Sequence, residues 1–162
     1  MDTVYQFNPG YFNLKAYGLA NALLQNEIPV MWAIKASKTR TTLGSIDFIA
    51  NVKRVFPDTS SAANDTLRCG PFIIDSVWVS RALPIIAAYG NNVVVFKLNT
   101  GTTIDIRYTL TFKPHLILLN GGGFDTITVH QLTEAGFTSG SYTMQTTGQV
   151  FTPTTGYSLA SD

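Results

Sequence analysis

His115-Leu-Ile-Leu-Leu-Asn-Gly-Gly-Gly-Phe-Asp-Thr-Ile-Thr-Val-His-Gln-Leu-Thr-Glu-Ala-Gly136 is the stretch from which the fold is predicted. The four apolar residues after His115 are too few for an isolated helix and are typical of a strand covered on both faces. The glycines at 121–123 allow a sharp turn, and apolar residues then recur at helical spacing up to Gly136, a natural helix stop. The stretch therefore predicts a strand–loop–helix unit of a parallel α/β sheet.

The opening segment repeats this order of elements. A short strand over Thr3–Phe7 leads into a turn over Asn8–Phe12, as Leu119 leads into the glycines. Leu14–Asn26 then has apolar residues at positions i, i+3, i+4, i+7 and i+8, which predicts a helix with one buried stripe. Pro29 ends it, and Val30–Ile34 is predicted to be a second buried strand.

The middle of the chain, residues 45–112, is predicted to contain several strands and one helix. Residues 45–56 fit either a strand or a short helix, residues 57–67 read as a loop, and Gly70–Asp75 as an apolar strand. A helix should follow, with Pro84 in its first turn and Gly90 at its end. Strict alternation over Thr103–Phe112 predicts a half-buried antiparallel strand, joined by a hairpin to a strand over Asn92–Leu98.

These elements predict an α/β fold: an open, mostly parallel sheet with helices on both faces and one β-hairpin. Residues 1–146 are expected to form one domain. Residues 147–162 mix Thr, Gly, Pro and Ser with isolated aromatics, and we expect them to be an extended tail or the start of a linker. Such a tail suggests a piece of a longer protein.

Charge is scarce in this chain. Of its 162 residues 45% are hydrophobic and only 13% are charged, and the formal net charge is +1. No global field therefore attracts nucleic acid, and no apolar run approaches the ~20 residues needed to span a bilayer, so neither nucleic-acid binding nor membrane insertion is predicted. A surface of hydroxyls and amides is common in secreted or surface-assembled bacterial proteins. The amino-terminal residues lack a basic and apolar signal region, which fits a cytoplasmic protein or a removed signal.

A binding site is expected where the strand-to-helix loops would meet, at the carboxyl edge of the predicted sheet. Glycine N–H groups at helix starts, beside lysines, could hold a small polar or anionic ligand there. The alternative is that the glycines only permit tight turns. The candidate ligand-binding residues are Asn8, Gly10, Lys35, Lys38, Asp75, Asn120, Gly121, Gly122 and Gly123.

The stretch Leu116–Phe124, with the helix ending Glu134-Ala-Gly-Phe137, resembles the opening unit of class I glutamine-amidotransferase-like domains. Gly70-Pro-Phe-Ile-Ile-Asp75 is similar to strands in flavodoxin-like modules of large secreted bacterial surface proteins. The resemblance covers about a third of the chain. It implies a flavodoxin-like fold, and no family activity follows from it.

The catalytic residues of that family are not matched. Its nucleophilic cysteine follows a strand, whereas Cys69 and His115 each precede one and His130 falls within a helix. No catalytic residue is therefore predicted, and Cys69 is interpreted as an inert thiol. The aspartates, Asp47 among them, are dispersed and read as caps or solvated side chains, so neither a metal nor a cofactor is predicted.

Two functions remain open from the sequence. The first is a non-catalytic α/β module of a secreted or surface-assembled bacterial protein, outside the cell or on its surface, acting in self-assembly or ligand binding. Its partners would be other copies of itself or neighbouring domains, giving oligomers. The alternative is an amidotransferase-like or hydrolase-like enzyme with its site at the carboxyl edge of the sheet.

Overall fold

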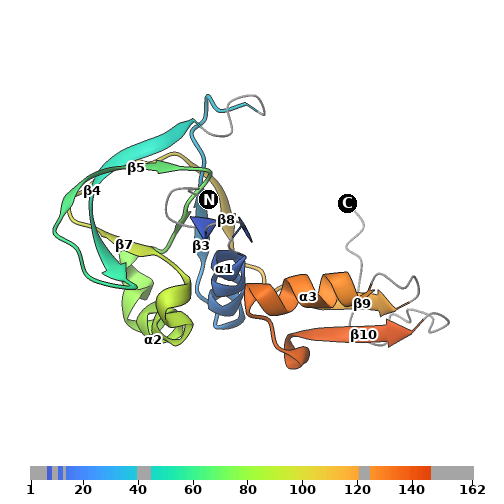
Figure 1. The fold of residues 1–162 in the computed structure, drawn as a ribbon. Coiled ribbons are helices and arrows are strands. Elements are labelled where there is room, and N and C mark those ends of the chain that lie inside the picture. Colours follow the sequence, from blue (N-terminus) through green and yellow to red (C-terminus); the bar gives the residue numbers. More distant parts are fainter. Residues whose placement is uncertain (1–6, 9–10, 13, 40–44, 121–124, 147–162) are drawn as a thin grey trace.

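Helix α1 (Lys15–Gln25) and the next strand, β3 (Val30–Ala33), form the centre of the fold (Figure 1). The computed structural model describes residues 7–8, 11–12, 14–39, 45–120 and 125–146. The apolar stripe predicted for the helix is buried, and β3 begins and ends with fully enclosed side chains, Val30 and Ala33. The predicted helix and strand are both confirmed here.

Two further helices pack against α1, namely α2 (Val79–Tyr89) and α3 (Asp125–Ala135). Gly18 makes the α3 contact possible, because a Cβ at this position would collide with the backbone carbonyl of Ala135. The Tyr89 hydroxyl also lies beside Gly18, so the three helices meet at one point. Partial burial there raises the pKa of Tyr89 above its ordinary value.

The first sheet has the strand order β6-β3-β8. Strands β6 (Phe72–Ile73) and β8 (Ile106–Leu110) both run antiparallel to β3. Trp32 at the centre lies opposite Phe72 on one side and Tyr108 on the other, with ring centroids 5.7 and 6.1 Å away. Aromatic pairs therefore link all three strands.

The second sheet has the order β5-β4-β7 and is also antiparallel. The sequence of residues 45–56 fits either a strand or a short helix. In the structure they contain the long strand β4 (Ile46–Phe56). Strand β7 (Val95–Leu98) pairs with one side of β4, and β5 (Ala63–Arg68) with the other. The prediction of a loop over residues 57–67 is wrong at its end, because β5 begins there. This sheet forms the arch on the left of Figure 1.

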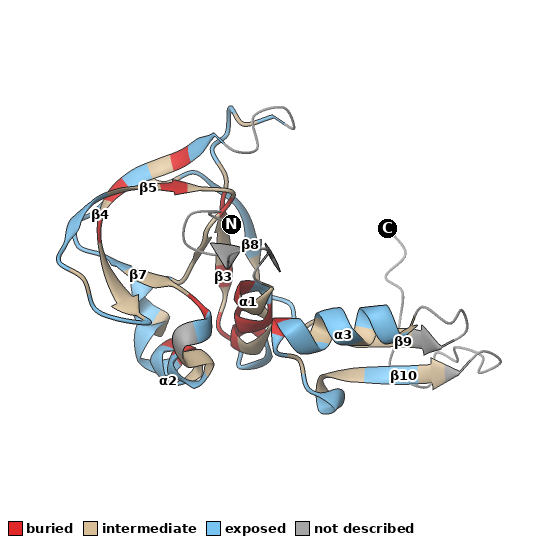
Figure 2. Cartoon of the chain, in the orientation of Figure 1, coloured by how far each residue is buried: buried red, intermediate tan, exposed pale blue. Residues whose placement is uncertain are grey.

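Residues 115–136 form the predicted strand and helix locally. Strand β9 (Leu116–Asn120) leads through α3 to β10 (Tyr142–Thr146), and the two strands pair in parallel. Residues 121–124, between strand and helix, lie outside the described residues. Figure 2 shows that α3 and β10 are largely exposed or half-buried, in contrast to α1.

The predicted open, mostly parallel, flavodoxin-like sheet is wrong. In the described part of the chain both three-stranded sheets are antiparallel, and β9 with β10 is the one parallel pair. The predicted hairpin is also wrong, because β7 joins the sheet of β4 whereas β8 joins that of β3. Alternating strands and helices predict parallel pairing only if each helix connects two neighbouring strands, and here α1 and α2 do not.

Three local predictions also need correction. Asn8 does not begin a strand-to-helix turn, since β1 (Phe7–Asn8) and β2 (Tyr11–Phe12) pair as an antiparallel ribbon. Pro84 lies inside α2 rather than in its first turn, although Gly90 ends the helix as predicted. The tail predicted for residues 147–162 lies outside the described residues.

Candidate functional site

Asp47 is the buried charged residue of the part that the structure describes, and it connects three segments of the chain. Its Oδ2 atom accepts hydrogen bonds from Lys38 Nζ at 2.7 Å and from the Gly70 N–H at 2.8 Å. Its Oδ1 atom accepts one from the Lys35 N–H at 3.1 Å. The loop after β3, the start of β4 and the turn before β6 are thereby held together.

The Lys38–Asp47 ion pair is almost completely enclosed. The two side chains are 3% and 1% exposed, respectively. A buried pair of this kind is costly to break, because losing one partner leaves the other charge desolvated and unpaired, at about 3–5 kcal/mol. Lys38 therefore serves the fold, and its charge is already neutralised.

The turn at Cys69 and Gly70 presents a backbone N–H to Asp47. Both residues have left-handed backbone conformations, with φ of 59° and 67°. A Cβ on Gly70 would lie 2.5 Å from Trp32 Nε1, which itself donates to the Gly70 carbonyl at 2.8 Å. Only glycine fits under the indole, so the Asp47 cluster extends to Trp32 in the first sheet.

Of the predicted ligand residues, the structure brings Lys35 and Lys38 together. They line one shallow depression with side chains from the start of β4 and the end of β5. Its lining residues are Lys35, Ser37, Lys38, Ser45, Ile46 and Arg68. Lys35 is exposed, in contrast to Lys38.

Asp75 does not join them. Its Oδ1 accepts from the Val77 N–H at 3.0 Å and caps the short 3₁₀ turn Ser76–Trp78 ahead of α2. Because β6 runs antiparallel to β3, Asp75 follows β6 at the amino end of β3, whereas Lys35 follows the carboxyl end. Antiparallel neighbours alternate in direction, so the predicted common carboxyl edge does not form.

The other predicted ligand residues lie elsewhere or outside the described structure. Asn8 pairs with Tyr11 in the β1–β2 ribbon, and Asn120 ends β9 in the parallel pair. The side chains of both are outside the described part. Gly10 and the glycines at 121–123 are not described at all.

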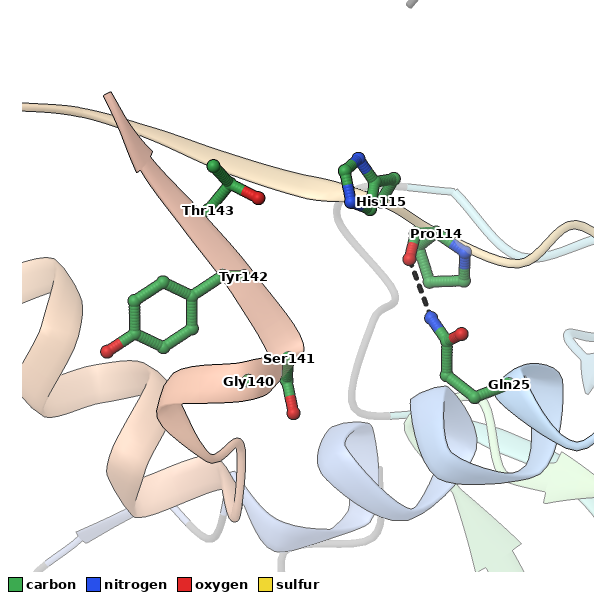
Figure 3. A pocket seen from close by; sticks show the side chains of 7 residues that line it. All are labelled: Gln25, Pro114, His115, Gly140, Ser141, Tyr142 and Thr143. Carbon is green, nitrogen blue, oxygen red and sulfur yellow. Dashed lines mark hydrogen bonds between the residues drawn. The ribbon is translucent and has the colours of Figure 1, made fainter. Parts of the chain in front are cut away.

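A second, polar pocket lies between the end of α1 and the start of β10 (Figure 3). Gln25 Nε2 donates to the Pro114 carbonyl at 2.7 Å across it. His115 lines it from the segment before β9, as expected from its position ahead of a strand. Ser141 also lines it, but its hydroxyl takes part in a capping box with Thr138 around the 3₁₀ turn Ser139–Ser141.

Cys69 packs against the buried core cluster, in the place of a small apolar residue. It precedes β6, as expected from the sequence. Burial and the neighbouring Cys69 raise the pKa of Tyr17 above its ordinary value.

The sequence interpretation missed Asp47 and Gly70. Asp47 was read as one of several dispersed carboxylates. The available signal was its position inside the apolar run Ile46–Ala50, where a solvated carboxylate is out of place. The basic loop before β4 supplies the partner charge through Lys38, nine residues earlier.

An apolar row at the edge of the first sheet is the other notable surface. Tyr108 is 53% exposed and Phe112, just beyond β8, is 86% exposed. Ile106 on the same strand is also exposed. These residues belong to the alternating set that the sequence predicts to be half-buried.

Comparison with protein-family models, with curated protein sequences and with solved structures finds no match to this chain. The resemblance to amidotransferase-like domains therefore stays a prediction from the sequence. Within the described ranges, no helix is both long and apolar enough to cross a membrane. The same residues contain no cluster of three or more His, Cys, Asp or Glu side chains suited to a metal ion.

Proposed function

We propose that this chain is a non-catalytic module of a secreted or surface-assembled bacterial protein, located outside the cell or on its surface, and that it acts by association. Its partner is another copy of itself or a neighbouring domain. The observation that supports this function is the apolar row Ile106, Tyr108 and Phe112 on and beyond strand β8.

The sequence pattern of β8 and the exposure of its side chains do not match. Strict alternation of apolar and polar residues is typical of a strand with one covered face. On β8 the inner end of that face is covered, since Leu110 packs against the core cluster opposite the fully buried Val30. Farther along the same face Tyr108, which pairs with Trp32, is exposed. The register shifts at the next position, where the exposed Ile106 pairs with Ala33, so the shared face of Leu110 and Tyr108 ends there. A partner seated on this part of β8 would cover that face.

The position of β8 also favours association. It is an edge strand of the described sheet β6-β3-β8, and such edges are templates for pairing with another chain. The scarcity of charge in the whole chain lowers the electrostatic cost of bringing two such surfaces together.

Light scattering of the purified chain between about 1 μM and about 1 mM, the range of weak to moderate Kd values, tests this function. We expect the apparent mass to rise with concentration. Phe112→Asp should weaken the association by about tenfold or more, because exposed aromatics dominate interface energetics.

Thr109→Asp is the matched control. Thr109 lies on the same strand and is exposed, but it faces the opposite side of the sheet, opposite Met31. Its replacement should leave the association unchanged. A monomer at every concentration, or equal effects of the two substitutions, would contradict self-assembly through this row.

The enzyme alternative depends on a crevice at a common carboxyl edge. The antiparallel arrangement separates the ends of β3 and β6 that would line it. Cys69, the residue closest to the family nucleophile in type, packs against the core. No observation on the described residues favours this alternative over association.

A further inference from the structure

We propose that strand β10 pairs, along its outer edge, with β10 of a second copy of this chain. The two-stranded sheet of β9 and β10 then continues across a two-fold axis as a four-stranded sheet. This surface shares no residue with the apolar row on and beyond β8, so either association can be lost without the other.

The sheet of β9 and β10 is incomplete within one chain. Its strands pair in parallel from Leu116 with Tyr142 to Asn120 with Thr146, and among the described residues neither strand pairs with any other. Parallel sheets are normally covered on both faces, and a two-stranded sheet buries little area by itself. Helix α3 contacts β9, and Figure 2 shows β10 as exposed or half-buried where its side chains are described. In the described part of the chain β10 is therefore an open edge.

The composition of β10 leaves this edge unprotected. Natural edge strands commonly carry charged side chains, prolines or β-bulges that keep another strand from pairing with them. Strands β5 and β7, at the edges of the described second sheet, carry Asp65, Arg68 and Lys97. Strand β10 has no charged residue and no proline, and its register with β9 is unbroken. An uncharged, regular strand of this kind favours pairing with a further strand.

The second strand that fits this edge best is β10 itself. In an antiparallel pair with Met144 opposite its own copy, Tyr142 lies opposite Thr146 and Thr143 lies opposite Gln145. No two charges meet in this arrangement, and Met144, which is 43% exposed in the single chain, packs against its counterpart. A charged strand would lose the hydration of its charges without gaining an ion pair with β10. The lack of charge therefore favours a second copy as the partner.

Two self-complementary surfaces on one chain change the assembly that it forms. A single such surface closes a dimer, whereas two different ones link copies into a closed tetramer or an open filament. With both β8 and β10 active, the wild type should therefore grow beyond a dimer.

Light scattering of the full chain between about 1 μM and about 1 mM measures both surfaces separately. Met144→Lys places two ammonium groups opposite each other on the two-fold axis and should raise the Kd of the β10 contact by about tenfold or more. Phe112→Asp should stop at the dimer formed through β10, and the double variant should stay a monomer.

Gln131→Lys is the matched control. Gln131 is exposed on α3 of the same unit, so its replacement adds the same charge away from the strand edge. The mass of this variant should follow that of the wild type. Thr143→Lys, at an exposed position of β10, is a second variant that should act like Met144→Lys, should the latter fail to fold by circular dichroism.

Backbone hydrogen exchange identifies what occupies the edge. We expect the amide groups of β10 to exchange more slowly at about 1 mM than at about 10 μM, because a second copy pairs with them only at high concentration. Slow exchange that is equal at both concentrations would mean that the chain's own residues, such as 147–162, occupy the edge. Fast exchange at both concentrations would mean that nothing pairs there. Either result would overturn the proposal.

The variants separate this proposal from the association through β8. Equal masses for Met144→Lys and Gln131→Lys would contradict pairing through β10. A mass that falls in Met144→Lys but not in Phe112→Asp would support pairing through β10 and contradict association through β8.

Discussion

The centre of the molecule and its carboxyl-terminal unit use similar apolar sequences with different results. In α1 and β3 most apolar side chains are buried, with Leu23 only 2% exposed and Val30 and Ala33 fully enclosed. In the β9–α3–β10 unit, Ala135 is the buried residue of α3, and the described apolar residues of β9 are half-buried. An apolar run therefore predicts burial only where several elements surround it.

The neighbours of each helix explain the difference. Helix α1 contacts α2, α3 and β3, so different sides of it are covered. Helix α3 contacts one strand, β9, and touches α1 at its end, through Gly18 and Ala135. Hydrophobic stabilisation scales with the area removed from water, so the central region should supply most of the folding free energy.

The largest expected effect is that of removing the buried carboxylate. Asp47→Ala leaves Lys38 enclosed without its partner and should lower the free energy of unfolding by about 3–5 kcal/mol in urea denaturation. Asp58→Ala is the control. Asp58, like Asp47, forms an ion pair, in this case with Arg54, but its side chain is exposed. It should cost less than about 1 kcal/mol. Similar losses for the two would mean that burial does not set the cost of breaking these pairs.

A second pair of variants compares the two regions directly. Leu23→Ala should lower the free energy of unfolding by about 2–5 kcal/mol, because it creates a cavity in the enclosed core. Leu118→Ala in β9 removes the same atoms from a half-buried position and should cost about 1 kcal/mol. Equal costs would show that the carboxyl-terminal unit is covered in solution, for instance by a second copy.

A third substitution tests the contact between the central helix α1 and helix α3 of the carboxyl-terminal unit. Gly18→Ala places a Cβ against the carbonyl of Ala135 and should cost about 1–3 kcal/mol through overpacking. Because the collision lies between α1 and α3, hydrogen exchange should quicken in α3 more than in α2. Gly101→Ala, where the added Cβ meets nothing within 4 Å, is the control. A uniform rise in exchange would contradict a separable carboxyl-terminal unit.

The smallest expected effect concerns an exposed ion pair that links the end of α1 to the segment before β9. Lys113 Nζ lies 3.0 Å from Glu27 Oε1, and its hydrogen bond and charge lower the pKa of Glu27 below 4.5. A lowered carboxyl pKa stabilises the fold above pH 4.5, and this contribution disappears as the pH falls through the folded-state pKa.

Glu27→Gln should therefore melt slightly below the wild type at about pH 6, and this difference should shrink as the pH falls through the folded-state pKa of Glu27. Thermal unfolding followed by circular dichroism over this pH range measures the difference. A difference in melting temperature that grows as the pH falls would contradict a stabilising Glu27–Lys113 ion pair.

Local structure was largely predictable from the sequence. Helical spacing predicted α1, and the strand–loop–helix pattern predicted β9 and α3. The pattern also predicted the helix stop at Gly136, whose φ is 94°. Strand β5 was missed because Asn64-Asp-Thr66 has the composition of a turn. Pairing with β4 along its whole length makes that stretch a strand despite its composition.

Strand pairing was not predictable, because periodicity reports which residues face inward and not which strand lies alongside. The candidate site fails for this reason at Asp75, whose strand runs in the opposite direction from the one assumed. Lys35 and Lys38 come together because they are close in sequence. Pro84 was misplaced because a helix with an exposed face tolerates an interior proline whose missing bond can be replaced by water.

Hydrogen-bonded side-chain amides link neighbouring segments of the second sheet. The side-chain amide of Asn51 on β4 accepts a hydrogen bond from Asn99 at 2.9 Å and donates one to Asn64 on β5 at 3.1 Å. A slip of β5 by one residue would turn Asn64 to the opposite face and break its bond. These neutral amides therefore specify strand alignment at an exposed surface, and they do so independently of pH and ionic strength.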